Sequence, residues 1–95
     1  MVRTSEPGDN GRVARNANPE LAAALGKAIL GRRRELERSQ EDIAHESDMS
    51  TRQYINIESG VGNALVGNVY AIAQALDLRF SELAERTERA MRRRR

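Results

Sequence analysis

Residues 39–60, SQEDIAHESDMSTRQYINIESG, contain the pattern that most constrains the fold of this chain. Two short amphipathic stretches are separated only by Asp48-Met49-Ser50. Isolated helices of this length are marginal in water, so tertiary packing has to hold both of them. The pattern therefore predicts a helical domain in which the outer face of this paired unit is available for another task.

Cap residues predict where the first two helices begin. Asn18-Pro19-Glu20 suits a helix start, because Asn is a good N-cap, Pro fits the first turn and Glu complements the positive end of the helix dipole. This helix is expected to end near Arg38. Ser39 is expected to cap a second helix, and Asp48 tolerates the left-handed conformation that the following turn needs.

Three further helices are expected after this turn. Ser50 and Gln53 have the spacing of a capping box, so a helix should begin at Thr51, and Gly60 should end it. The next helix follows from apolar residues at three- and four-residue intervals between Val66 and Leu76. The last is expected from about residue 81 toward residue 91.

Composition supports an all-α fold and limits the chemistry. The 95 residues include one Phe, two Tyr and no Trp, so the core has to be mainly aliphatic. No Cys is present, which excludes disulfides and thiolate metal sites. With a lone His45, no Ser/His/Asp set and no phosphate-cradling glycine loop, we expect no enzyme, metal or cofactor. Without a membrane-spanning apolar run, a cytoplasmic protein is expected.

The charged residues divide the chain into three parts. Residues 1–17 lack apolar periodicity and are expected to form a flexible N-terminal arm, residues 18–91 the domain, and residues 92–95 a basic tail. Six Arg against two Glu leave +4 on residues 85–95, whereas residues 20–84 carry −3 of the overall +2. A polyanion would therefore need a local positive face on the central domain.

The outer face of residues 51–59 carries groups suited to reading DNA. A helical wheel places Tyr54, Ile57 and Glu58 on one side and Arg52, Ile55, Asn56 and Ser59 on the other. Arg can bind guanine bidentately, Asn can do the same to adenine, and Ile can contact a thymine methyl. Polar residues also cover the exposed face of any small helical protein, so this pattern alone does not decide the function.

Three motifs at fixed mutual spacing resemble a known family. The Ser-Gln-Glu-x-Ile-Ala element at residue 39, Ile-Glu-x-Gly at residue 57 and Ile-Ala-x-Ala-Leu at residue 72 are similar to those of the Cro and lambda-repressor-like (Xre type) helix-turn-helix DNA-binding domains. The resemblance covers about residues 21–84. It implies a compact five-helix lambda-repressor-like domain whose helix-turn-helix spans residues 40–59, with the recognition helix at 51–59.

The resemblance also assigns roles to individual residues. It implies base reading by Thr51, Arg52, Gln53 and Asn56, and DNA phosphate contacts by Ser39, Gln40, Ser59 and Asn63. Gln40 is also expected to brace the first recognition residue. Arg33 and Glu58 occupy the positions of a structural ion pair between the first and third helices.

Several residues depart from the family pattern. Arg38 and Arg32 stand where apolar residues are common, Asp48 replaces the turn glycine, and Ser47 occupies a position that is often apolar. The loop after residue 59 lacks the Lys and Arg with which many relatives hold phosphate. Arg32, Arg38, the arm with Arg12 and Arg15, or the terminal arginines would then have to supply that contact.

One recognition helix reads too few base pairs to define a genomic site, so we expect a homodimer on a pseudo-palindromic operator. The expected dimer interface is the last helix, through Phe80, Leu83, Thr87 and Met91, with the end of the helix before it. The predicted function is a transcriptional regulator, most simply a repressor, with double-stranded DNA as its partner. An antitoxin paired with a toxin, a restriction-modification controller and a protein-interaction adaptor that does not read DNA are the alternatives.

Overall fold

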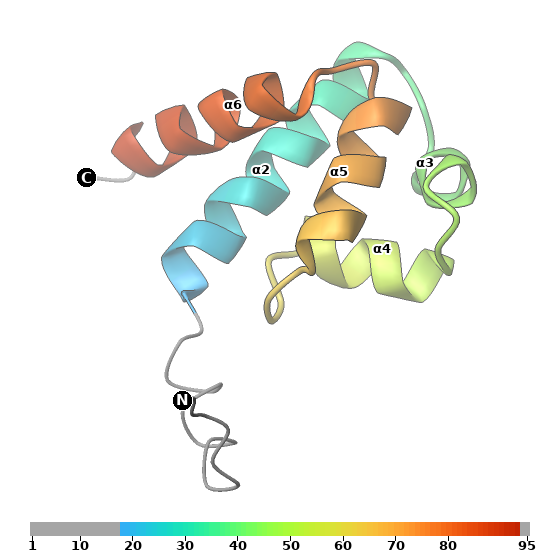
Figure 1. The fold of residues 1–95 in the computed structure, drawn as a ribbon, viewed down its shortest axis with the longest axis horizontal. Helices are drawn as coiled ribbons and strands as arrows, with labels where there is room; N and C mark the ends of the chain where they lie inside the picture. The colour runs from blue at the N-terminus through green and yellow to red at the C-terminus, as the bar shows by residue number, and fades with distance from the viewer. Residues whose placement is uncertain (1–17, 94–95) are drawn as a thin grey trace, which may run out of the picture.

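The computed structural model describes residues 18–93, which form five α-helices (Figure 1). The expected arm, residues 1–17, and the last two arginines of the expected tail lie outside the described residues. The all-α prediction is confirmed, because residues 18–93 contain no strand. The helices are α2 (Pro19–Glu35), α3 (Gln40–Glu46), α4 (Thr51–Glu58), α5 (Val66–Ala75) and α6 (Phe80–Arg93).

The first three helices begin where their cap residues predict. The Asn18 side chain accepts a hydrogen bond from the Leu21 amide at 3.0 Å. Ser39 and Ser50 cap α3 and α4 in the same way, through bonds of 3.0 and 3.1 Å from the amides of Asp42 and Gln53. Each cap satisfies one of the amides that the first helical turn leaves without a partner.

The first four helices all end in the same hydrogen-bonded turn. The second residue after each helix has positive φ, namely Glu37 (56°), Asp48 (58°), Gly60 (78°) and Asp77 (60°). The next amide then bonds to the carbonyl five residues earlier, as in Leu78 to Ala73 at 2.9 Å. The first helix consequently ends at Glu35, three residues before the predicted end at Arg38.

A mainly aliphatic core lies between the helices. Tyr54 is its one fully buried aromatic side chain within residues 18–93. The other buried members of the cluster are Ile29, Ile43, Ala44, Ile57, Ile72, Ala73, Leu76, Leu78 and Leu83. Helix α2 packs against both α4 and α6, while α3 packs against α4 and α5, so α4 lies at the edge of the domain (Figure 1).

The last turn of α4 lies directly against the backbone of α2. A Cβ atom at Gly26 would come within 2.3 Å of the Glu58 carbonyl oxygen, and one at Gly60 within 2.9 Å of the Ala23 Cα. Real Cβ atoms do not approach other atoms this closely, so both positions require glycine. The two glycines therefore set how closely, and at what angle, α4 crosses α2.

Candidate nucleic-acid interface

Helix α4 has one buried side and one uncovered side. Tyr54 and Ile57 are buried in the core, whereas Arg52, Gln53 and Asn56 are exposed. Thr51 and Ile55 are partly buried. The exposed side chains come from successive turns of one helix, so they form a continuous polar face with hydrogen-bonding atoms that match base edges.

The carboxylate of Glu58 holds this helix to two others. Its Oε2 accepts hydrogen bonds from Arg33 Nε at 2.8 Å and from the Tyr54 hydroxyl at 2.6 Å. Its Oε1 accepts bonds from Arg33 Nη2 at 3.1 Å and from Gln40 Nε2 at 2.8 Å. The expected Arg33–Glu58 ion pair is therefore present and bidentate. Side chains from α2, α3 and α4 all meet at this carboxylate.

The electrostatics of this cluster favour the charged form of Glu58. Burial raises the pKa of Glu58, but hydrogen bonds from Arg33, Tyr54 and Gln40 outweigh it, so the net shift of this pKa is downward. The Glu58 partner also raises the pKa of Arg33. Burial, followed by the bond to Glu58, raises the pKa of Tyr54. The cluster is therefore an ionised structural element, consistent with the architectural role expected for the ion pair.

The side chain of Gln40 differs from its expected role. Its amide nitrogen bonds to Glu58 at the far end of α4, so it does not brace Thr51 as the family pattern implies. The geometry is simple: Gln40 is the first residue of α3 and points across to the last turn of α4. Of the other residues expected at phosphates, Ser39 is the exposed cap of α3, Ser59 the exposed cap of α4, and Asn63 an exposed loop residue.

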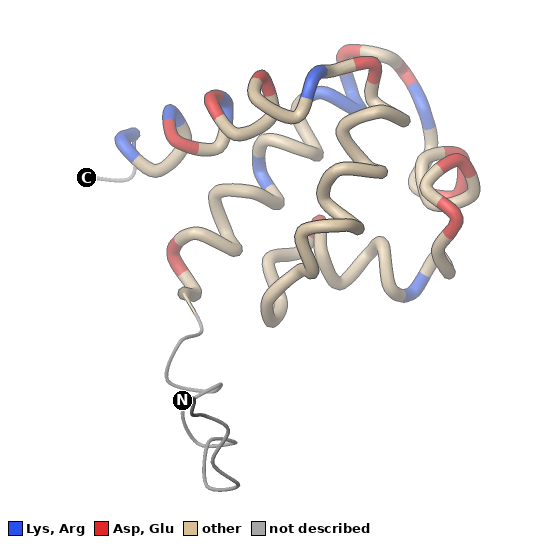
Figure 2. The backbone as a smooth tube through the Cα atoms, viewed as in Figure 1, with Lys and Arg blue, Asp and Glu red and all other residues tan. Residues whose placement is uncertain are grey.

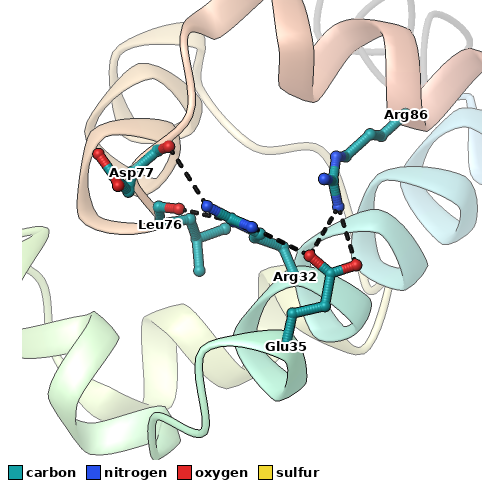
Figure 3. Close-up of polar contacts among 5 residues, drawn as sticks. All are labelled: Arg32, Glu35, Leu76, Asp77 and Arg86. Carbon is teal, nitrogen blue, oxygen red and sulfur yellow. Dashed lines mark hydrogen bonds and ion pairs between the residues drawn. The ribbon is translucent and has the colours of Figure 1, made fainter.

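Arg32, one of the expected substitute phosphate contacts, caps a helix instead. Its Nε donates to the Leu76 carbonyl at 2.9 Å and its Nη2 to the Asp77 carbonyl at 3.5 Å, at the end of α5 (Figure 3). Its Nη1 bonds to Glu35 at 3.0 Å. Sequence reasoning missed this role, because the two partners lie more than forty positions away in the chain. A cation where an apolar residue is usual was the one available signal.

Arg38, the other substitute, pairs within the domain. Its Nη2 lies 2.6 Å from Glu46 and its Nε 3.6 Å from Asp42, both on α3. Its carbonyl also accepts a bond from Arg33 at 2.9 Å. Both Arg32 and Arg38 are thus engaged by partners within the domain, which corrects the expectation that they are available to hold phosphate.

Charge is distributed unevenly over the domain (Figure 2). Exposed carboxylates on α3 and its following turn belong to Glu41, Asp42, Glu46 and Asp48. Arg52 is the one Lys or Arg between residues 39 and 78, and α5 contains no charged residue. The recognition face therefore has a single formal positive charge, and most cations of residues 18–93 lie on α2 and α6.

The expected dimer surface is partly wrong. Leu83 is fully buried and Thr87 is 4 % exposed, because both pack into the interior of their own chain. Phe80 is exposed and Met91 is partly buried. The most exposed large apolar residues are instead at the beginning of α5, where Leu65 is 73 % and Val66 71 % exposed. An apolar groove of about 610 Å³ runs beside them between α2, α5 and α6, and Leu21, Val66 and Phe80 are among its lining residues.

Two observations concern other classes of site. None of the helices in residues 18–93 is long and apolar enough to cross a membrane. In the same span, no three side chains of His, Asp or Glu come together as metal ligands.

The comparisons with known proteins agree with this geometry. A family model described as helix-turn-helix matches residues 29–83, which is more than half of the chain. A comparison with curated proteins gave no match. The matched segment contains α3, the turn at Asp48 and α4, together with all three sequence motifs. The chain therefore belongs to the Xre, lambda-repressor-like helix-turn-helix family of DNA-binding regulatory domains.

Proposed function

We propose that this chain is a sequence-specific, double-stranded DNA-binding repressor that places α4 in the major groove. The observation that carries this proposal is the exposed face of α4, with Arg52 and Asn56 one turn apart on a helix whose other side is fixed by Glu58. A rigid support matters, because base reading requires side chains held in register with the base edges.

Each polar residue of this face has a distinct proposed role. Arg52 would donate two hydrogen bonds to a guanine, and Asn56 would pair with an adenine. Thr51 and Gln53 are the flanking base contacts. Ser39, Gln40, Ser59 and Asn63 are the proposed phosphate contacts, all uncharged, so they would position the domain and contribute little of the salt-dependent affinity.

The weak positive charge of this face supports a homodimer. With Arg52 as its single cation, the recognition face of one domain has little electrostatic attraction for a duplex. Two copies on a pseudo-palindrome, with recognition helices about 34 Å apart, double the contacts and the length of sequence read. The proposed surface is the apolar groove with Leu65, Val66 and Phe80, because charges are absent from α5 and large apolar side chains are exposed there.

Sedimentation tests the dimer. The wild-type chain is expected to sediment as a dimer at tens of micromolar. This concentration is chosen because a small interface gives a modest affinity between the two copies. Val66→Asp should shift it to a monomer, because a carboxylate would be buried without a partner. Ser81→Asp, an equal charge change at an exposed site outside the groove, is the control. A wild-type monomer that binds one protein per site would remove the dimer from the proposal.

DNA binding is tested by removing the two base-reading side chains. Arg52→Ala with Asn56→Ala should lower affinity for the preferred duplex by about 10²- to 10³-fold, since each bidentate contact contributes about 1–3 kcal/mol of discrimination. Arg79→Ala, an exposed arginine outside α4, is the control. Equal losses in both variants would contradict base reading by α4.

A protein-interaction adaptor is the second candidate. It is favoured by the four exposed carboxylates of α3 and its turn, which repel a polyanion. If the double variant binds duplex DNA with unchanged affinity and sequence preference, the adaptor replaces the repressor as the proposed function.

A further inference from the structure

A basic groove runs between α2 and α6, separate from the recognition helix. Its volume is about 540 Å³, and the residues with side-chain charge that line it are Lys27, Glu35, Arg86, Arg89 and Arg93. Four cations and one carboxylate leave a formal charge of +3. We propose that this groove binds the phosphodiester backbone of double-stranded nucleic acid without regard to sequence. It would be a second site, in addition to the base-reading face of α4.

The groove opens away from α4. Two residues of α2 that contact the last turn of α4 are Gly26, through its backbone, and Arg33, through its ion pair. At 100° per residue, Gly31 in the groove is rotated by about 140° from Gly26 and by about 160° from Arg33. One straight duplex segment against α4 would therefore leave the groove free for another.

Gly31 is unexplained by the packing of the chain itself. A Cβ atom there would have no heavy atom within 4 Å among the described residues, in contrast to Gly26 on the same helix. Glycine inside a helix costs about 1 kcal/mol relative to alanine. The residue leaves the floor of the basic groove flat, which permits a bulky ligand backbone to approach α2 closely.

The arginines of α6 form a row suited to phosphates. Arg86, Arg89 and Arg93 lie on one face of the helix and span about 10 Å along it. Successive phosphates wind around the axis of B-form DNA, and a row of about 10 Å is long enough to contact two or three of them along one strand. Arginine also binds phosphate oxygens through two parallel hydrogen bonds.

Neighbouring contacts hold one end of this row in place. Arg86 Nη1 lies 3.3 Å from both carboxylate oxygens of Glu35, and Glu35 is itself held by Arg32 (Figure 3). Arg89 and Arg93 have no ion pair within residues 18–93 and are exposed. The groove therefore combines a positioned guanidinium with two that are available to a ligand.

The lining favours a duplex backbone over other polyanionic surfaces. It contains no aromatic side chain, so bases of a single strand would have no stacking platform. The regular charge spacing of a duplex matches the row better than the irregular carboxylates of an acidic protein. The exposed carboxylates of α3 and its turn repel DNA. Nonspecific DNA is therefore expected to be attracted first to the side of the domain that carries the groove between α2 and α6.

The test measures binding of a random-sequence 20-base-pair duplex by fluorescence anisotropy at several salt concentrations. Arg89→Gln with Arg93→Gln should weaken binding at least tenfold and reduce the salt slope by about 2, since each phosphate contact contributes about 0.9. Gly31→Glu, which places a carboxylate in open space, should weaken it as well. The matched control is Arg79→Gln with Arg92→Gln, which removes the same charge outside the groove and should change affinity less than threefold.

Measurements on the Arg52→Ala, Asn56→Ala background separate this proposal from the repressor proposal. There, random-duplex binding should persist and remain sensitive to Arg89 and Arg93, whether or not α4 reads bases. Circular dichroism confirms that each variant folds. Equal losses in the groove variant and the control would overturn the proposal. So would poly-glutamate of matched charge binding as tightly with the same dependence on Arg89 and Arg93, because the groove would then be a site for acidic protein.

Discussion

Gln40 and Glu58 connect the first residue of α3 to the last residue of α4 through a hydrogen bond of 2.8 Å between Nε2 and Oε1. The two helices of the helix-turn-helix are thus joined at the turn by Asp48 and again at their opposite ends. Arg33 on α2 and Tyr54 on α4 bind the same carboxylate. The orientation of the recognition face therefore depends on one side chain that does not itself lie on that face.

Glu58→Gln should destabilise the domain strongly. The Glu58 side chain is 6 % exposed, and its loss of charge leaves the partly buried Arg33 without a counter-ion. Breaking a buried pair in this way typically costs about 3–5 kcal/mol. Urea unfolding measures the change, with the exposed Glu85→Gln as the control. A loss no larger than that of the control would show that the cluster does not hold the helices.

Stability should also depend on pH through Glu58. Because the pKa of Glu58 is lower in the folded protein, its contribution is complete above the unfolded-state pKa of about 4.3 and is lost as pH falls through the folded value. Carboxylates titrate between about pH 3 and pH 6, so the midpoint of urea unfolding is measured over this range. As pH falls, this midpoint should decrease more in the wild type than in Glu58→Gln. Parallel pH profiles for the two proteins would contradict this assignment.

Ser47→Ala should leave stability unchanged or raise it by about 1 kcal/mol. The Ser47 hydroxyl is buried and has no hydrogen-bond partner among residues 18–93, and a buried polar group without a partner costs about 1–3 kcal/mol. Ser50→Ala is the matched comparison, because its hydroxyl caps α4 and its loss should cost about 1 kcal/mol. Thermal unfolding of both variants gives the sign directly. Destabilisation by Ser47→Ala of the same size would mean that this hydroxyl has a partner in solution.

Introducing glycine at a position of positive φ should stabilise the domain, whereas replacing a glycine that lies against another helix should destabilise it. Glu37→Gly should stabilise by about 0.5–1 kcal/mol, since Glu37 has a positive φ that glycine adopts without steric cost. Gly26→Ala should destabilise by more than 1 kcal/mol, because the new Cβ would collide with the Glu58 carbonyl and displace α4. Gly31→Ala serves as the control, because its Cβ meets open space. A Gly26→Ala variant as stable as Gly31→Ala would contradict the close contact between α2 and α4.

The sequence predicted the features that depend on neighbouring residues. The caps at Ser39 and Ser50 and the left-handed Asp48 involve residues within one helical turn, and the structure contains all three. The Arg33–Glu58 pair is not local, and it was predicted from the family pattern. Features that depend on how helices meet were missed or misplaced.

Three residues show why the rest could not be predicted. Arg32 caps α5, which is adjacent to it only after folding. A glycine inside a helix, such as Gly26, normally lowers helix stability, and only the position of α4 in the fold explains why it is needed there. Leu83 belongs to the apolar stripe of α6 that was expected to form the dimer interface, yet it is buried within its own chain. The orientation of α6 on α2 decides which stripe of the helix faces inward.

The most direct test of base reading by α4 is selection of binding sites from random duplex DNA, performed with wild type, Arg52→Ala and Asn56→Ala. We predict an enriched pseudo-palindrome whose half-sites are about one helical turn apart. A guanine preference should disappear in Arg52→Ala and an adenine preference in Asn56→Ala. An enriched sequence that is identical for all three proteins, or no enrichment with the wild type, would contradict base reading by α4.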